Sequence, residues 1–344
     1  MPAPRAAAVP PSNPPPGQAP LTRGQSNSAL RPVRPVAAAP RPAAEPEDMM
    51  PMSGSAASFT AALDAEALAY FSKVAKEPFS KQAVAFLNAY WPEVGSQAEF
   101  IFTVAWETMK YADMHTKGIS LIHLYDEGAD LDFNIGLYFY EKLCNKVLEA
   151  AEGKKWRQDS RFAPSMPEML TAIVRKQELR EKVDVNFDGR ISFLEYLLYQ
   201  YREFTNPADF VKRSLRTAEM PDHPEIIKAR AALEEVNEAI RAYEREKSRL
   251  LAECKQPGVR GLAAQHTLAQ LAASPLAEKL NKALISAEAA VRIATRKFGP
   301  GGTEVAESEE EGKPVQGSLW WLNRDMEDKK KLYGRRASQY VTAS

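Results

Sequence analysis

The chain contains 344 residues with 45 basic and 45 acidic side chains, so its formal net charge at pH 7 is zero. This balance excludes the global positive field that draws proteins to nucleic acid or to anionic membranes, and we expect neither partner. Cys144 and Cys254 are the only cysteines, which excludes a disulfide framework and a zinc site. With no secretory signal and no run of about 20 apolar residues, the sequence predicts a reduced protein of the cytoplasm.

Residues 1–58 have no aromatic side chain and hold more than half of the chain's 25 prolines. A segment of this composition buries too little apolar surface to offset the entropy that it loses on folding. We therefore predict a disordered Pro/Ala-rich tail over residues 1–58.

Helical periodicity begins at Phe59, where apolar side chains start to recur on one helical face. Similar apolar stripes predict further helices over residues 98–111, 137–149, 168–183 and 193–204. Residues 59–204 are therefore predicted to form one helical domain.

The next segment, residues 205–298, has the pattern of a helical hairpin. From Pro224 to Lys255 apolar residues follow the a/d heptad pattern of a coiled coil, and a Gln-Pro-Gly turn follows. A second Ala/Leu-rich helix is expected to run to Phe298 with a bend at Pro275. The two helices are predicted to pack antiparallel.

The chain after the hairpin divides into an acidic linker, residues 299–316, and a Trp-containing basic C-terminal tail, residues 317–344. Trp320 and Trp321 are adjacent, and two neighbouring tryptophans are too apolar to be left in water without a reason. Our hypothesis is that they pack back on the helical core or on the hairpin and help to set which surface is exposed. A C-terminal staple without a regulatory role is the alternative.

The segment from Asp184 to Glu195 fits the 12-residue calcium loop of an EF-hand. Oxygen ligands stand at positions 1, 3, 5 and 12, and Gly189 stands at position 6, where the chain must turn sharply. Calcium prefers six to eight oxygen ligands, and the backbone carbonyl of position 7 supplies one of them. The predicted calcium (Ca2+) ligands are Asp184, Asn186, Asp188, Arg190 and Glu195.

EF-hands normally occur in pairs, and residues 130–141 are the candidate for the partner loop. Its acidic and amide residues fit positions 1, 3, 5 and 12, but Ile135 occupies the position that requires glycine. The segment is either a weak calcium site or a structural partner without calcium. Its candidate ligands are Asp130, Asp132, Asn134 and Glu141.

Together these patterns predict an all-α fold in which an EF-hand helical domain precedes a long antiparallel helical hairpin. The sequence contains no GxSxG, HExxH or Walker motif and no Gly-rich turn after a strand. We therefore predict that the protein is not an enzyme.

Two segments carry a resemblance to a known family. Residues 184–204, DVNFDGRISFLEYLLYQYREF, and residues 317–328, GSLWWLNRDMED, resemble the calcium-regulated 34-kilodalton actin-bundling proteins of protists. The tail motif is the more specific of the two, because the EF-hand pattern is shared by many proteins. The likeness covers about residues 59–331, and the N-terminal tail departs from it.

The resemblance implies a monomeric cytoskeletal protein that crosslinks F-actin at low calcium and releases it when calcium bound to the EF-hands inhibits bundling. It also implies that the strong filament contact lies on the hairpin. Actin filaments are acidic, so basic hairpin residues are candidate contacts, although solvated faces with i,i+4 ion pairs explain most of them. The candidate partner-binding residues are Lys228, Arg241, Arg245, Arg249, Trp320 and Trp321.

Two other functions fit the same residues. One is a calcium sensor that captures an amphipathic helix of a target other than actin. The other is a passive scaffold in which calcium is only structural.

Overall fold

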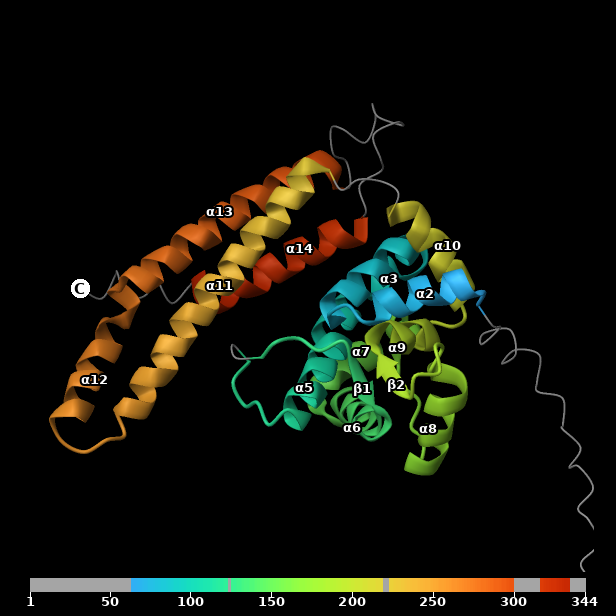
Figure 1. Ribbon diagram of the computed structural model, residues 1–344, viewed down its shortest axis with the longest axis horizontal. Helices are drawn as coiled ribbons and strands as arrows, with labels where there is room; N and C mark the ends of the chain where they lie inside the picture. Colours follow the sequence, from blue (N-terminus) through green and yellow to red (C-terminus); the bar gives the residue numbers. More distant parts are fainter. Residues whose placement is uncertain (1–62, 123–124, 219–222, 300–315, 335–344) are drawn as a thin grey trace, which may run out of the picture. The chain divides into compact units, whose positions relative to one another are not determined.

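The computed structural model describes residues 63–122, 125–218, 223–299 and 316–334, so the predicted N-terminal tail and most of the acidic linker lie outside the described residues. The fold is all-α with one two-stranded antiparallel sheet, which confirms the predicted class (Figure 1). The proposed domain boundaries stay a prediction. The helices and strands are α2 (Ala65–Ala75), α3 (Phe79–Val94), α4 (Ala98–Phe100), α5 (Glu107–Thr116), β1 (Asp130–Asp132), α6 (Phe133–Cys144), α7 (Lys154–Gln158), α8 (Ala172–Glu178), β2 (Arg190–Ser192), α9 (Phe193–Gln200), α10 (Pro207–Ala218), α11 (Pro224–Glu253), α12 (Val259–Gln270), α13 (Pro275–Phe298) and α14 (Gln316–Lys329).

Local signals in the sequence explain several helix ends. The Asp64 carboxylate accepts a hydrogen bond from the Ala67 amide and so caps α2. Ser192 and Glu195 form a reciprocal capping box at the start of α9. Ser274 caps α13, and Pro275 occupies its first turn, where a missing amide hydrogen costs nothing.

The first hydrophobic core surrounds α3, which packs against α9, α10 and α14. Many of its members are aromatic and lose almost all of their exposed surface, including Phe71, Phe79, Phe86, Phe102, Phe139, Phe193 and Phe210. Strands β1 and β2 lie on this core, with Leu131 opposite Ile191. The strand pair therefore joins two helical segments around a single core.

The second core joins α11 to α13, which run side by side in opposite directions (Figure 1). Its buried residues include Leu233, Val236, Leu284, Ala287 and Val291. The predicted antiparallel hairpin is therefore present. The expected bend at Pro275 is wrong, because α12 ends at Gln270 and a short 3₁₀ turn, η8 (Leu271–Ala273), separates it from α13.

Helix α14 packs on both cores. Trp321 is buried, and its ring lies 4.9 Å from the Phe102 ring and 5.0 Å from the Trp106 ring, both in the first core. On another face, Leu319 and Leu322 belong to the second core. The predicted packing of the tryptophan tail is thus observed against both parts of the chain, while its regulatory role stays a hypothesis.

None of the helices in the described parts of the chain is both long enough and apolar enough to cross a membrane.

We predict that Trp321→Ala lowers the free energy of unfolding by about 3 kcal/mol or more, because a buried tryptophan leaves a large cavity when truncated. The control is Leu332→Ala in the exposed turn after α14, which should change stability by less than about 0.5 kcal/mol. Urea denaturation followed by fluorescence and circular dichroism measures both. Equal effects of the two substitutions would contradict the packing described for α14.

Candidate calcium-binding loop

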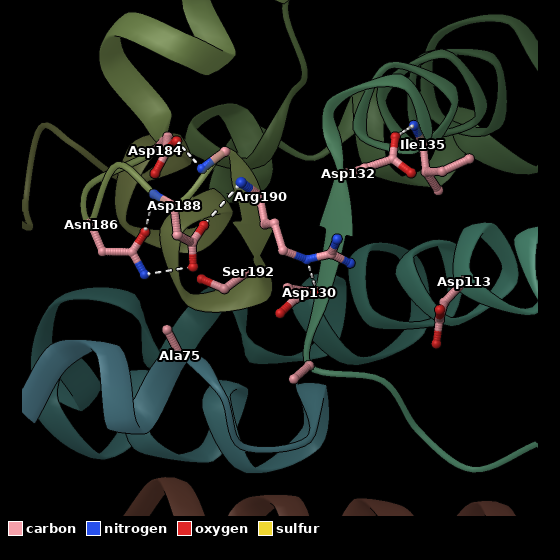
Figure 2. A network of polar contacts seen from close by, with 12 residues as sticks. Ala75, Asp113, Asp130, Asp132, Ile135, Asp184, Asn186, Asp188, Arg190 and Ser192 are labelled. Atoms are coloured by element: carbon pink, nitrogen blue, oxygen red, sulfur yellow. Dashed lines mark hydrogen bonds and ion pairs between the residues drawn. The ribbon is translucent and has the colours of Figure 1, made fainter.

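The loop that begins at Asp184 lies between two helical segments. The entering segment is α8 with its π-helical extension η7 (Leu179–Val183), and the exiting segment is α9. Figure 2 shows Asp184, Asn186 and Asp188 placed around one tight turn that leads into β2. A helix, a loop and a second helix therefore follow one another here, in the order that the sequence predicts for an EF-hand.

The backbone of this loop has two residues with positive φ. Gly189 has φ of 76°, as predicted from its position in the loop, and Phe187 has φ of 57°. A residue with a side chain has a strained backbone at positive φ, so the backbone is strained at Phe187 but not at Gly189. The curvature brings the oxygen-bearing side chains of alternate residues toward the inside of the turn.

Hydrogen bonds between side chains and backbone hold that curvature. The Asp184 Oδ2 atom accepts from the Gly189 amide at 3.0 Å, and Asp188 Oδ1 accepts from the Arg190 amide at 2.9 Å. The Asn186 Oδ1 atom accepts from the Asp188 amide at 3.2 Å. Three of the predicted ligand residues are therefore positioned by the loop's own backbone.

Asp184 provides the test of whether this loop suits a cation. Its Oδ1 atom is buried and has no hydrogen-bond partner among the described residues. Burial also raises the pKa of the Asp184 carboxyl. A buried, unpartnered carboxylate oxygen is costly without a counter-charge, and a calcium ion held by this loop would supply that charge.

Glu195, the predicted bidentate ligand, is turned toward the backbone. Its Oε1 atom accepts from the Val185 amide at 2.9 Å, and its Oε2 atom accepts from the Ser192 amide at 2.8 Å. Burial raises the pKa of the Glu195 carboxyl to about 8. Across the described residues, no three His, Cys, Asp or Glu side chains converge as a metal site, so ligation requires Glu195 to rotate out of its capping box.

The second predicted loop, residues 130–141, is not formed. Asp130–Asp132 is the strand β1, and the residues that follow are the helix α6, so Asn134 and Glu141 both lie on that helix. Leu131 pairs with Ile191, which makes Ile135 the counterpart of Glu195. The register of the prediction was wrong, and an isoleucine stands where a bidentate carboxylate is needed.

The predicted ligands Asp130 and Asp132 have other partners in the structure. The Asp130 carboxylate forms an ion pair with the Arg190 side chain (Figure 2). The Asp132 Oδ1 atom accepts from the amides of Asn134 at 2.8 Å and Ile135 at 3.1 Å and so caps α6. Each of the two carboxylates therefore has a partner within the protein.

A polar cluster that the sequence analysis missed holds the segment that leads into β1. The Asp113 Oδ2 atom accepts from Tyr125 Oη at 2.6 Å and from Lys117 Nζ at 2.8 Å. A Cβ atom on Gly128 would lie 2.4 Å from the same oxygen, so a larger residue there would displace the Asp113 carboxylate. Contacts among the chain's own residues therefore hold this segment in place.

Gln82 is a second residue that the sequence analysis missed. It is fully buried, and its Nε2 atom donates to the carbonyls of Ala75 at 2.8 Å and Ala129 at 2.7 Å. Its Oε1 atom accepts from the Leu194 amide at 2.8 Å. Gln82 therefore connects α3 to the residue before β1 and to the first turn of α9, where Leu194 is next to Glu195.

Comparisons with known proteins identify the family of this chain. The family described as "F actin bundling C terminal" matches residues 190–315. The "Calcium-regulated actin-bundling protein" of Dictyostelium discoideum is 60% identical over 277 residues, which cover 80% of this chain and 92% of that protein. The chain belongs to this family. The crystal structure of the 34 kDa F-actin bundling protein of the same organism matches with a TM-score of 0.70 and 60% identity, over 79% of this chain and 98% of that one.

Family membership confirms the resemblance seen in residues 184–204 and 317–328. The Dictyostelium relative is a filament-bundling protein and not an enzyme, and the prediction of a non-enzymatic protein is therefore confirmed. The calcium ligands themselves stay a prediction that rests on the geometry of the loop.

We predict that the protein binds one calcium ion per chain and that Glu195→Gln weakens this binding by at least about tenfold, since even outer-shell residues contribute that much to metal affinity. The matched control is Glu141→Gln, which makes the same chemical change at an exposed position of α6 and should leave calcium affinity unchanged. Isothermal titration calorimetry measures affinity and stoichiometry. If calorimetry finds two calcium sites per chain and Glu141→Gln removes one of them, residues 130–141 bind calcium in the register predicted from the sequence.

Proposed function

We propose that this protein is a monomeric, cytoskeletal crosslinker of F-actin and that calcium bound at Asp184, Asn186, Asp188, the Arg190 carbonyl and Glu195 inhibits bundling. The observation that carries the proposal is the double role of Glu195. It occupies the calcium-ligand position, and it also caps the helix α9. Calcium binding therefore competes with the capping box and alters the start of α9.

The next step leads from α9 to α3. The Leu194 amide, in the first turn of α9, donates to the buried Gln82 side chain of α3. Phe193 lies in the same core, with its ring 6.4 Å from that of Phe79 at the start of α3. A change in the first turn of α9 must therefore either move α3 or break a buried hydrogen bond, which costs about 1–3 kcal/mol.

The third step leads from α3 to α14. The Asn88 Oδ1 atom accepts from the Ser318 amide at 2.7 Å, and the Asn88 Nδ2 atom donates to Ser318 Oγ at 3.0 Å. A Cβ atom on Gly317 would lie 2.7 Å from the Leu87 backbone, so the two helices approach as closely as glycine permits. Arg324 of α14 adds an ion pair to Glu99.

The last step leads from α14 to the hairpin, where the filament contact is proposed. Arg230 of α11 donates to Ser318 Oγ at 3.0 Å, the same oxygen that Asn88 contacts. Leu319, Leu322 and Met326 are buried in the hairpin core. This chain of contacts supports a route by which calcium in the loop changes the position of the hairpin.

The candidate filament contacts differ in their availability. Lys228 pairs with Glu225, and Arg249 pairs with Glu246 and Glu253. Arg241 lies 3.9 Å from Asp126, and Arg245 is exposed with no ion pair among the described residues.

The tryptophans differ from these basic residues. Trp321 is buried against the rings of Phe102 and Trp106, and Trp320 is partly buried, with its ring 6.4 Å from that of Trp91. We therefore propose that the two tryptophans hold α14 in place and that the basic hairpin residues contact the filament.

A second candidate function is a calcium sensor or scaffold that binds a helix of another target. Met169, Ile173 and Val174, on and just before α8, are exposed, with Ile173 at 83%. An apolar patch beside a calcium loop is a feature of target-binding EF-hand proteins. Under this alternative the protein would not pellet with actin filaments.

The test is co-sedimentation with actin filaments at low and high centrifugal force, with chelator and with calcium. We expect bundles to pellet at low force with chelator and much less with calcium. Glu195→Gln should bundle equally in both conditions, and Glu141→Gln should respond to calcium as the unmodified protein does. If the unmodified protein bundles filaments equally with chelator and with calcium, the proposed inhibition is contradicted. If it does not bind filaments in either condition, the second candidate function is favoured.

A further inference from the structure

We propose that a cavity beside α5 and the end of α6 binds a nucleoside di- or triphosphate. The two helices pack against each other (Figure 1), and the residues that line the cavity lie between Glu107 and Ala150. The cavity is therefore separate from the calcium loop and from the hairpin. Its volume is about 920 Å³, within the range of about 300–1,000 Å³ that is usual for pockets of small organic ligands. The apolar part of its lining is Met114, Ile119 and Ile122.

Lysine side chains give this cavity a positive charge. Lys110, Lys142 and Lys146 line it together with the Glu107 carboxylate, which pairs with Lys146 at 3.2 Å. Lys110 and Lys142 form no ion pair and no side-chain hydrogen bond with any residue that the structure describes, and each instead lies near an aromatic ring. Two positive charges therefore stay available to an anionic ligand, and lysine is a common ligand of phosphate groups.

Lys110 is the cation that gains most from an anion in the cavity. Its Nζ atom lies 3.3 Å from the centroid of the Trp106 ring, and desolvation by burial lowers the pKa of its ammonium group. The nearby Glu127 carboxylate offsets only part of this desolvation, because its oxygens accept hydrogen bonds from Ser80 and Trp106 and not from Lys110. A desolvated ammonium group without an acceptor is costly, and a phosphate oxygen in the cavity would supply the acceptor.

Aromatic rings form the other part of the cavity. Tyr111 and His115, one helical turn apart on α5, both line it, and Tyr111 is 54% exposed. The Tyr138 ring of α6 stacks on both, with its centroid 6.4 Å from that of Tyr111 and 4.8 Å from that of His115. Tyr138 therefore holds the two rings nearly parallel, and a nucleobase can stack on aromatic rings of this kind. Lysines for phosphate and rings for a base together fit a nucleotide better than a simple anion.

The test is isothermal titration calorimetry of the full chain with ATP in chelator, where calcium cannot compete for the phosphates. We expect one ATP per chain, and we expect Lys142→Ala to weaken binding by about tenfold, because a charged partner of the phosphates is lost. Tyr111→Ala should weaken it by about fivefold or more, because the base loses a stacking partner. The matched control is Lys155→Ala, which removes an exposed lysine that lies 4.5 Å from the Trp156 ring centroid, outside the cavity. This control should bind ATP as the unmodified protein does.

Titrations of the unmodified protein with tripolyphosphate and with adenosine test the two parts of the site without any substitution, and both should bind more weakly than ATP. The proposal is overturned if ATP does not bind, if either fragment binds as tightly as ATP, or if Lys142→Ala and Tyr111→Ala both bind ATP normally. Pelleting with phosphatidylcholine vesicles that contain a phosphoinositide, without ATP binding and lost in Lys142→Ala, would assign the lysines to a lipid headgroup and also overturn it. None of these outcomes depends on filament bundling, so the proposed function is tested separately.

Discussion

The constraint on which the structure depends is that α14 has two faces to bury. One face places Trp321 between aromatic rings of the first core, and another places Leu319, Leu322 and Met326 in the hairpin core. A helix of 14 residues cannot move relative to one core without disturbing its contacts with the other. Because interiors are close-packed, such a helix responds to force by shifting between arrangements rather than by bending gradually.

In the proposed function, calcium binding at residues 184–195 is the source of such a shift. Asp184 carries a buried oxygen without a partner, and burial raises the pKa of the Glu195 carboxyl to about 8. The proposed function requires that a bound divalent cation stabilise both groups and that this gain exceed the loss of the capping box at α9. A tenfold change in the balance between two arrangements requires only about 1.4 kcal/mol, which is of the size of one buried hydrogen bond.

The parts of this structure that were predictable from the sequence are those set by local chemistry. The helices follow from apolar periodicity, and the loop at residues 184–195 follows from alternating oxygen ligands with Gly189 between them. The loop predicted at residues 130–141 was placed in the wrong register because its acidic residues were matched to ligand positions. The correct signal was the likeness between Leu131-Asp132-Phe133 and Ile191-Ser192-Phe193, each of which enters a helix after a strand residue.

Features that depend on contacts distant in the sequence were not predictable. Gln82 looks like an ordinary helix residue in the sequence, and only the fold brings Leu194 and Ala129 to its side chain. The same is true of Asn88, whose partner Ser318 lies 230 residues away. The break before Pro275 was misread as a bend, because a proline preceded by a serine cap starts a new helix as readily as it kinks an existing one.

The most direct test of this account is amide hydrogen exchange of the full chain with chelator and with calcium. The account predicts that calcium changes exchange in three places, the first turn of α9, the middle of α3 and residues 318–326 of α14, and that Glu195→Gln abolishes all three changes together. A calcium effect confined to residues 184–195 would contradict it and would leave calcium with a purely structural role.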